Sequence, residues 1–437
     1  MEDKFSFMKG AKIYQVFIDR FAGHKEKYTP NELRKDFLYG NIKALTTKLD
    51  YIKSMNFNMI WLTPFYVNQP KGYHGYHVQN FNHVDPRFAY GENIEDKNVG
   101  NVFDENDVKI ETGADLVLKD FVEQCHKKDL KVMMDFVPNH AYETHPFFIE
   151  AKKDEKSKYR NWFYFIKNKK KELSFFEYLF GSAEENVPEY RHLAFLDFGN
   201  LPKLNLDNPD VQNHLINSTK KFLAYGIDAV RVDHALGPKV ESLKIVIDKI
   251  HETYPNVPFI GEIVSFDSTK YAECILGLSK ETLEKLNKVD PTTLKVLDEV
   301  YLDYSKIMDG VLDFSFQCYV DLFVRGKISE EKCIKELEEH FKRFENKKNF
   351  FLLKNIDSHD EDRIMFRCKN NMALAQKAIK LLYTDFLGRK DPIVFYYGTE
   401  DFMTQEKTIR GEPYGDFRCR QPMYFGNEWI NKLLKEK

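Results

Sequence analysis

The chain has 437 residues, of which 43% are hydrophobic and 30% charged, and its formal net charge at pH 7 is only −3. This near-neutral balance provides no electrostatic footprint for nucleic acid or for an anionic membrane, so we expect neither as a partner. The six cysteines form no C-x-x-C pair and lack zinc-ligand spacing. Residues 1–10 lack the apolar core of a signal peptide, and no run of about 18 apolar residues occurs. These features favour a cytoplasmic enzyme that acts on an uncharged substrate.

Eight short apolar segments follow one another along the chain. They are rich in β-branched and aromatic residues and almost continuously apolar, as expected of parallel strands that are buried on both faces. They cover residues 13–18, 59–63, 132–137, 229–233, 259–264, 311–316, 351–356 and 393–397.

Helical patterns separate these segments. Apolar side chains between residues 114 and 125 recur at the spacing of one helical stripe. Thr112 precedes this stripe as a suitable N-cap, with Asp115 three residues later. Asn208 and Pro209 open a second helix, and residues 334–344 carry the apolar pattern of a later one.

Strands that alternate with helices eight times predict an α/β fold, a closed (β/α)8 TIM barrel. Two connections, residues 65–111 and 140–206, are too long for simple βα loops. The second contains aromatic groups at 161–165 and 175–178, and we interpret it as a small domain inserted after the third strand. We therefore predict barrel strands 1–3 in residues 1–140, an inserted domain in 141–204 and barrel strands 4–8 in 205–437. Only 37 residues follow Glu400, so no C-terminal β-sandwich is evident.

Charged side chains gather where four of the predicted strands end. In such barrels the active site lies at the C-terminal ends of the strands. These ends contain Asp135, Asn139 and His140 after the third strand, Arg231 and Asp233 in the fourth, Glu262 in the fifth, and His359 and Asp360 after the seventh. An ordinary strand-end ion pair is an alternative interpretation for any single residue, but four such ends together favour a functional site.

The fourth and fifth strands suggest a pair of carboxyl groups with different roles. Arg231 and Asp233 are two residues apart in a strand and therefore point to the same face. We expect the guanidinium to lower the pKa of Asp233 and keep it ionised, as a nucleophile requires. Glu262 follows an apolar segment, where burial is expected to raise its pKa and keep a proton on it. This pairing is the one that cleaves glycosidic bonds through a covalent intermediate.

At these residues the sequence resembles the α-amylase superfamily, glycoside hydrolase family 13, over nearly the whole chain. Residues 135–140 read Asp-Phe-Val-Pro-Asn-His, 231–233 read Arg-Val-Asp, 261–262 read Gly-Glu and 359–360 read His-Asp, which match four family motifs in order. Residues 73–76 read Tyr-His-Gly-Tyr, like a substrate-stacking segment of the family. Each motif is weak alone, but the set is highly specific.

The resemblance implies a role for each matching residue. Asp233 would be the nucleophile, Glu262 the general acid/base and Asp360 a third carboxylate that holds sugar hydroxyl groups. Arg231 would orient Asp233. The implied substrate-binding residues are Tyr76, His74, His140, His359 and Arg363. We add His234, which follows the nucleophile directly, as a contact on the acceptor side, with a purely structural histidine as the alternative.

Residues 201–205, Leu-Pro-Lys-Leu-Asn, are similar to a motif of neopullulanases, cyclomaltodextrinases and maltogenic amylases. This similarity implies a retaining glycosidase that hydrolyses α-1,4-glucosidic bonds in malto-oligosaccharides or related α-glucans, with cleavage of α-1,6 bonds left open. A 4-α-glucanotransferase with the same carboxylates is the main alternative. A barrel without catalysis that serves as a scaffold is a third, and the presence of all three carboxylates argues against it. The oligomeric state is left open.

Two residues depart from the family's calcium-site pattern. The resemblance places an acidic residue at the position of Lys203 and a histidine at the position of Gly237. An ammonium group repels Ca2+, which requires several oxygen ligands. We therefore predict no metal and no cofactor, with Asn139 holding the loop by hydrogen bonds.

Other cofactor signals are weak. His74, His77 and His83 are close in sequence, but they lack the carboxylate partners that orient metal-binding histidines. No glycine-rich phosphate-binding motif follows a predicted strand, so a nucleotide cofactor is not predicted.

Overall fold

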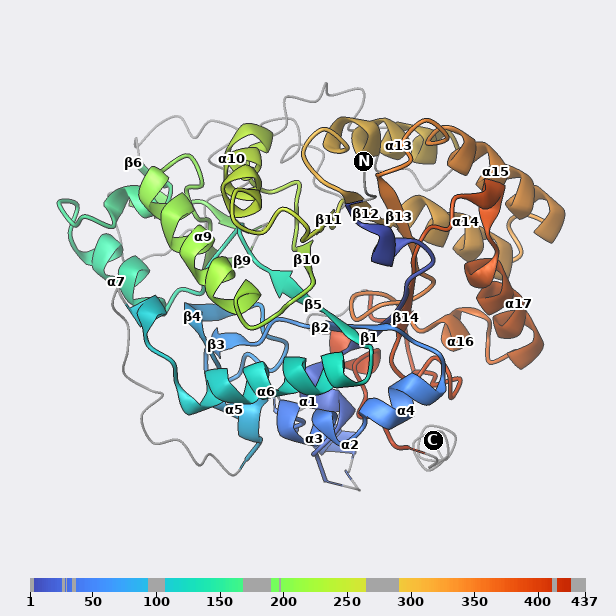
Figure 1. Cartoon of the computed structure of the whole chain (residues 1–437), viewed down its shortest axis with the longest axis horizontal. Helices are drawn as coiled ribbons and strands as arrows, with labels where there is room; N and C mark the ends of the chain where they lie inside the picture. Colours follow the sequence, from blue (N-terminus) through green and yellow to red (C-terminus); the bar gives the residue numbers. More distant parts are fainter. Residues whose placement is uncertain are drawn as a thin grey trace.

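A computed structural model of the chain describes residues 4–25, 28, 30–33, 37–92, 107–167, 190–195, 198–264, 291–410 and 415–425. These residues form a central barrel that is surrounded by helices (Figure 1). Within these ranges, no helix has the length and apolar character needed to cross a membrane.

The barrel is a closed sheet of eight parallel strands. In order around the barrel they are β1 (Lys12–Val16), β14 (Ile393–Tyr396), β13 (Phe351–Lys354), β12 (Gly310–Asp313), β11 (Phe259–Gly261), β10 (Ala229–Val232), β5 (Lys131–Phe136) and β2 (Met59–Leu62). The sheet closes because β1 pairs with both β14 and β2. Each strand overlaps one of the eight predicted segments, so the predicted (β/α)8 TIM barrel is confirmed.

Helices follow the strands and cover the outside of the barrel (Figure 1). They are α1 (Ile18–Phe21), α2 (Pro30–Leu33), α3 (Ile42–Thr46), α4 (Leu49–Ser54), α6 (Gly113–Lys127), α9 (Pro209–Leu223), α10 (Val240–His251), α13 (Pro291–Tyr304), α14 (Phe314–Val324), α15 (Glu330–Lys342), α16 (Ile364–Arg367) and α17 (Met372–Tyr383). As predicted, Thr112 and Asp115 form a capping box at the start of α6. Asn208 caps α9, with Pro209 in its first turn.

Two predicted strand segments run past their strands into helices: 13–18 reaches α1 at Ile18, and 311–316 reaches α14. The segment 311–316 is mostly apolar, but β12 ends at Asp313 and α14 begins at Phe314. The reason is the side chain of Asp313, which accepts a hydrogen bond from the backbone N–H of Phe316 at 2.9 Å and so caps the helix. A buried helix and a buried strand share the same continuous apolar pattern, so periodicity alone did not separate them.

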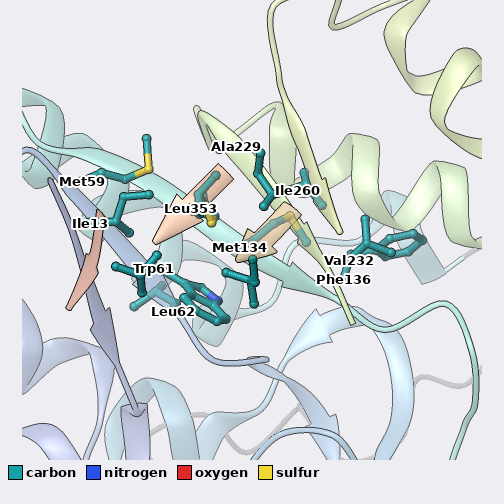
Figure 2. Close-up of a cluster of buried hydrophobic side chains, with 14 of the residues drawn as sticks. Ile13, Met59, Trp61, Leu62, Met134, Phe136, Ala229, Val232, Ile260 and Leu353 are labelled. Carbon is teal, nitrogen blue, oxygen red and sulfur yellow. The ribbon is translucent and has the colours of Figure 1, made fainter. Parts of the chain in front are cut away.

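The core of the molecule fills the barrel and the space between barrel and helices. Every residue of β2, β10, β11, β12, β13 and β14 is buried. Figure 2 shows side chains from several strands packed together, among them Trp61, Met134 and Leu353. Burial of each such side chain contributes about 1.5–3 kcal/mol, which holds the strand ends in fixed positions.

Short elements lie outside the barrel. Between β2 and α6 are β3 (Tyr66–Asn68), the antiparallel β4 (Val78–Val84), α5 (Pro86–Tyr90) and η2 (Asp107–Lys109). Between β5 and β10 are α7 (Pro146–Lys153), η3 (Arg160–Trp162), the pair β6 (Phe165–Lys167) and β7 (Tyr190–His192), and the pair β8 (Ala194–Phe195) and β9 (Phe198–Pro202). The aromatic group at 175–178 lies outside the described residues, and the boundaries of the inserted domain stay a prediction.

The segment 415–425 packs back on the first residues of the barrel. It begins with the 3-10 helix η5 (Gly415–Arg418). Besides η2 and η3, the described residues also form the 3-10 helices η1 (Ser6–Met8) and η4 (Phe386–Gly388). The backbone N–H of Met423 donates to the carbonyl oxygen of Arg20 at 2.7 Å. The ring of Phe425 packs edge-on against Phe21, with centroids 5.2 Å apart. This segment therefore carries its side chains to the rim of the barrel.

Candidate active site

The ends of β5, β10 and β11 bring the predicted site residues together. The strand register pairs Arg231 with Asp135 and Val232 with Gly261. Asp233 and Glu262 are the next residues of β10 and β11, and hydrogen bonds continue the ladder to both. Asp233 and Glu262 consequently stand on neighbouring strands at the C-terminal end of the barrel, where a barrel enzyme places its catalytic groups.

A single guanidinium joins three carboxylates at this rim. Arg231 is fully buried, and its Nη1 contacts Asp135 Oδ1 at 2.6 Å and Asp233 Oδ1 at 2.8 Å. Its Nη2 contacts Glu262 Oε1 at 2.6 Å. The cluster therefore has more acidic groups than cationic ones, a combination that is costly in a buried place unless a proton is shared.

Burial governs the protonation of this cluster. It raises the pKa of Asp233 to about 7, although Arg231 acts in the opposite direction. Burial also raises the pKa of Glu262, again opposed by Arg231. The raised pKa of Glu262 agrees with the prediction, but the expected low pKa of Asp233 is wrong. One guanidinium shared among three carboxylates does not compensate each of them for the loss of water.

The backbone of His234 holds Glu262 in place. Its N–H donates to Glu262 Oε2 at 2.8 Å, and the N–H of Ala235 donates to the Glu262 carbonyl oxygen at 3.0 Å. His234 has φ = 41°, a left-handed conformation that is uncommon outside glycine. Its ring packs edge-on against Phe195 from β8, with centroids 4.7 Å apart. The backbone contact is the clearest link between His234 and the carboxylate pair.

Asp360 approaches the cluster from the end of β13. Its Oδ2 lies 2.9 Å from His359 Nε2 and its Oδ1 lies 2.7 Å from Arg420 Nη2. Burial tends to raise the pKa of Asp360, but His359 and the guanidinium groups of Arg420 and Arg231 outweigh it, so the pKa lies well below its usual range. The side chain retains 46% exposure to solvent. Asp360 is thus an ionised carboxylate that a ligand from solvent reaches.

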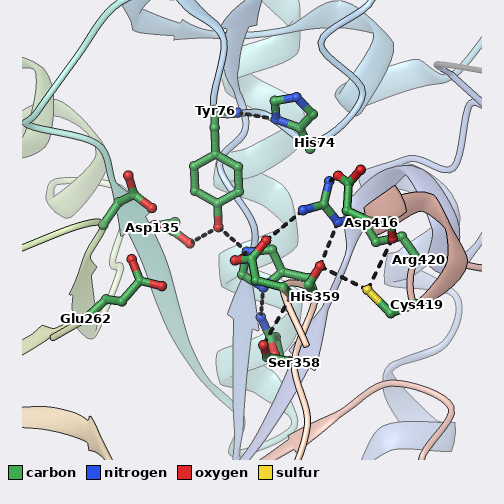
Figure 3. A network of polar contacts seen from close by, with 12 residues as sticks. His74, Tyr76, Asp135, Glu262, Ser358, His359, Asp416, Cys419 and Arg420 are labelled. Carbon is green, nitrogen blue, oxygen red and sulfur yellow. Dashed lines mark hydrogen bonds and ion pairs between the residues drawn. The ribbon is translucent and has the colours of Figure 1, made fainter. Parts of the chain in front are cut away.

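Tyr76 connects the two halves of the site. Its hydroxyl lies 2.9 Å from Asp135 Oδ2 and 2.7 Å from His359 Nε2 (Figure 3). The Tyr76 and His359 rings are nearly parallel, with an interplanar angle of 3°. The backbone N–H of Tyr76 donates to His74 Nδ1 at 3.1 Å, and His140 Nε2 lies 3.2 Å from its carbonyl oxygen. The structure therefore brings His74, Tyr76, His140 and His359 together beside the carboxylates.

Arg363 does not take the place that the resemblance implied. Its guanidinium is buried, with Nε donating to the carbonyl oxygen of Cys419 at 3.0 Å and Nη1 donating to the carbonyl oxygen of Tyr397. It also lies over the ring of Tyr396, 4.1 Å from its centroid. These contacts correct the expectation of a sugar contact: Arg363 anchors the segment 415–425 to the end of β14.

Arg420 is the site residue that sequence reasoning missed. Besides Asp360, it donates from Nε to the carbonyl oxygen of His359 at 2.7 Å, and it forms an ion pair with Asp416 (Figure 3). Its guanidinium also lies 3.3 Å from the hydroxyl of Tyr73. The cluster Asp416-x-x-x-Arg420 near the end of the chain was a signal, but nothing in its spacing relates it to Asp360.

The residues at the family's calcium position do not fit a cation. The ammonium group of Lys203 is buried and donates to the carbonyl oxygen of Gly237 at 2.5 Å. The Asn139 side chain is so close to Gly237 that a Cβ there would meet its Oδ1 at 2.1 Å. Across the described ranges, no group of three or more His, Cys, Asp or Glu side chains is arranged to hold a metal ion. Burial lowers the pKa of Lys203 to about 7, and a side-chain nitrogen at this position supplies none of the oxygen ligands that calcium requires.

Comparisons with known proteins agree with this geometry. A family model for the alpha amylase catalytic domain matches residues 15–112 and 98–425. Alpha-amylase 2 of Dictyoglomus thermophilum is 27% identical over 84% of this chain and 51% of its own length. The intracellular maltogenic amylase of Bacillus subtilis is 23% identical over 98% of this chain and 60% of its own length. The chain thus spans between half and three fifths of these two relatives.

A solved structure supports the fold. The alpha-amylase of Geobacillus thermoleovorans in complex with acarbose superposes with a TM-score of 0.67 at 24% identity. The match covers 98% of this chain and 77% of that one. The barrel and the elements around it are therefore shared.

Proposed function

Because this chain belongs to the family of alpha-amylase catalytic domains, we propose that it is a retaining glycosidase that hydrolyses α-1,4-glucosidic bonds in malto-oligosaccharides or related α-glucans. One observation carries the proposal: Asp233 and Glu262 contact neighbouring nitrogen atoms of the same guanidinium, at 2.8 and 2.6 Å. A shared guanidinium keeps the two carboxyl groups close, as a retaining mechanism requires, whereas an inverting enzyme needs room for a water molecule between them.

In the proposed reaction the carboxylate of Asp233 attacks the anomeric carbon of the sugar. Glu262 transfers its proton to the leaving glycosidic oxygen, and a covalent glycosyl-enzyme results. Glu262, now ionised, then removes a proton from water, which attacks the same carbon and restores both groups. Burial supports this assignment because it keeps a proton within the pair.

Asp360 is proposed to bind sugar hydroxyl groups and to stabilise the positive charge that develops on the sugar ring. Its exposure and its low pKa suit this role. The groups proposed to contact substrate are His74, Tyr76, His140, His359 and, through its ring, His234. Arg231 is proposed to hold the nucleophile, since it contacts Asp233 directly.

The enzyme is further proposed to work without calcium, because the buried side chain of Lys203 stands where the resemblance implies an acidic ligand and donates to the carbonyl oxygen of Gly237. A cytoplasmic location is proposed as well, in line with the name of the Bacillus subtilis relative. The domain division into residues 1–140, 141–204 and 205–437 stays part of the proposal.

The test is product analysis by chromatography over time, with maltotriose as the sole substrate. Glucose and maltose alone support the hydrolase, whereas early maltotetraose and longer products support the glucanotransferase. No turnover of maltotriose or of an α-1,6-linked analogue contradicts both and favours a scaffold. The anomeric configuration of the first product, read by NMR, tests retention, and inversion would contradict the roles given to Asp233 and Glu262.

A further inference from the structure

Aromatic rings enclose His359. The ring of Tyr76 is nearly parallel to it at 5.5 Å, that of Trp61 is edge-on at 6.2 Å and that of Phe17 is tilted at 6.2 Å. The residue is 1% exposed. This packing determines where the imidazole lies, but it does not decide which ring nitrogen carries hydrogen.

The contacts of Nε2 require a hydrogen on that atom. Nε2 lies 2.9 Å from Asp360 Oδ2, and an ionised carboxylate only accepts hydrogen bonds. It also lies 2.7 Å from the hydroxyl of Tyr76. The single hydrogen of Tyr76 is directed to Asp135 Oδ2 at 2.9 Å, so the Tyr76 oxygen accepts on its other side. Asp135 in turn accepts from Arg231 at 2.6 Å.

The contact of Nδ1 requires that this atom carries no hydrogen. Its neighbour is the side-chain amide nitrogen of Gln15, 2.8 Å away. Gln15 belongs to β1 and is completely buried. An amide nitrogen only donates, and therefore Nδ1 accepts.

We propose that Gln15 is a positioning residue that holds His359 as the neutral tautomer with hydrogen on Nε2. Hydrogen bonds then run in one direction, from Gln15 through His359 and Tyr76 to Asp135. Arg231 contacts both Asp135 and Asp233, and it thereby connects this chain of hydrogen bonds to Asp233. A residue at the start of the barrel thereby orients groups at the ends of three other strands.

The consequence for catalysis rests on the proposed function. A retaining glycosidase passes through a sugar with positive charge on its ring, which Asp360 is proposed to stabilise. An imidazolium at His359 would place a second cation against Asp360, next to Arg420, and would weaken that stabilisation. A neutral His359 shares its single Nε2 hydrogen between Asp360 Oδ2 and the Tyr76 oxygen without adding charge.

Nitrogen NMR of the histidine rings tests the tautomer directly. The protein is labelled with 15N-histidine, and the spectrum of His359→Gln identifies the resonances of His359 among the 13 histidines of the chain. We expect an unprotonated Nδ1 and a protonated Nε2 in the wild type at neutral pH. A protonated Nδ1 in the wild type would overturn the inference, whatever the enzyme's activity.

Two substitutions at Gln15 test its role. Gln15→Glu preserves size, but a carboxylate only accepts, so we expect hydrogen on both ring nitrogens, a shifted pH profile and a kcat lower by on the order of tenfold. Gln15→Met removes the donor, and we expect mixed tautomers with the ring still in place. If the glutamate variant does not fold, the wild-type and methionine spectra decide.

The matched control is Gln212→Glu, which makes the same exchange at a buried amide of α9 that donates to the carbonyl oxygen of Leu206 at 2.8 Å. It should leave the ring nitrogens of His359 and kcat unchanged. Unchanged ring resonances in Gln15→Glu contradict the inference. A wild type with the expected resonances but no turnover of any α-glucoside contradicts the proposed function and leaves the tautomer assignment standing.

Discussion

Arg231 and His340 each join several buried carboxylates, and the two clusters differ in charge balance. Arg231 contacts three carboxylates at the active-site rim. His340, on α15, lies 2.9 Å from Asp298 of α13 and 2.9 Å from Asp313 at the end of β12. Since Asp313 also ends a barrel strand, position at a strand end does not by itself separate a catalytic carboxylate from a structural one.

The two clusters differ in how many hydrogen bonds and ion pairs compensate each buried carboxylate. Asp298 also accepts from Ser315 at 2.9 Å and contacts Arg343 at 3.3 Å, while Asp313 caps α14. Burial would lower the pKa of His340, but the two aspartates outweigh it and raise the pKa to about 10. In the structural cluster a charged cation is favoured, whereas at the rim the protonated acid is favoured. A surplus of carboxylates over cations therefore distinguishes the reactive site.

The largest expected effect comes from removing one carboxylate at the rim. Asp233→Asn should lower kcat by about 10⁴-fold or more, because the nucleophile is lost. The melting temperature should stay the same or rise, since a surplus buried acid is removed. Steady-state kinetics and thermal melting measure both quantities. Full activity in this variant would remove the assignment of Asp233 as nucleophile.

The opposite change is expected in the structural cluster. His340→Gln removes the cation that Asp298 and Asp313 share, which leaves Arg343 as a contact of Asp298 alone, and should destabilise the fold by about 3–5 kcal/mol, with kcat per folded molecule unchanged. The raised pKa of His340 stabilises the fold fully below pH 6.5, and this contribution is lost as the pH rises through about 10. Denaturation at several pH values should show the gap closing above pH 10.

The control for this prediction is Lys244→Gln. Lys244 pairs with Asp248 on the surface of α10, where both side chains are about half exposed. An exposed pair contributes at most about 1 kcal/mol. Equal losses in the two variants would contradict the contrast between a balanced buried cluster and a surface pair.

A smaller effect separates the clusters by the pH range in which each one loses its contribution to stability. The raised pKa of Asp233 stabilises the fold fully below pH 3.8, and this contribution is lost as the pH rises through about 7. Asp233→Asn should therefore be more stable than the wild type above pH 7 and show no such gain below pH 3.8. Isothermal denaturation at both ends of this range measures the difference. A gain at low pH alone would contradict the assigned direction.

The smallest expected effect concerns a third buried cation, Lys203. A chelator such as EDTA should change neither melting temperature nor activity, because the ammonium group contacts Gly237 where a metal ion would be needed. Lys203→Met, which removes this contact, should cost about 1–3 kcal/mol. Melting curves with and without EDTA and calcium test this. A loss of stability in EDTA that calcium restores would contradict the proposed independence from calcium.

Much of the fold followed from the sequence because continuous apolar runs mark strands that are buried on both faces. The end of β12 did not, because a strand and a buried helix share that pattern and Asp313 alone marks the change. The rim carboxylates also followed, since a charge at the end of an apolar strand is conspicuous. The expected direction of the Asp233 pKa was wrong because the sequence displays Arg231 two residues away, but neither the complete burial of the carboxyl group, which raises its pKa most, nor the nearby Asp135 and Asp360.

Contacts between distant segments account for the remaining errors. Arg363 is three residues from Asp360, yet its side chain turns to the carbonyl oxygens of Tyr397 and Cys419. Arg420 is 60 positions from Asp360 and reaches it directly. Neither apolar periodicity nor local spacing contains this information, because both contacts depend on how residues 415–425 fold back over the barrel.

The closure of the barrel has a consequence for synthesis on the ribosome. β1 is the first strand to emerge and β14 the last, yet the two are neighbours, with Lys12 opposite Ile393. Until β14 appears, β1 and the newest strand both expose unpaired backbone groups to which other chains can add. Arg420 emerges later still. A chain that stops before residue 393 therefore cannot close the barrel, and the edges of β1 and of its last strand would be open to pairing with other chains.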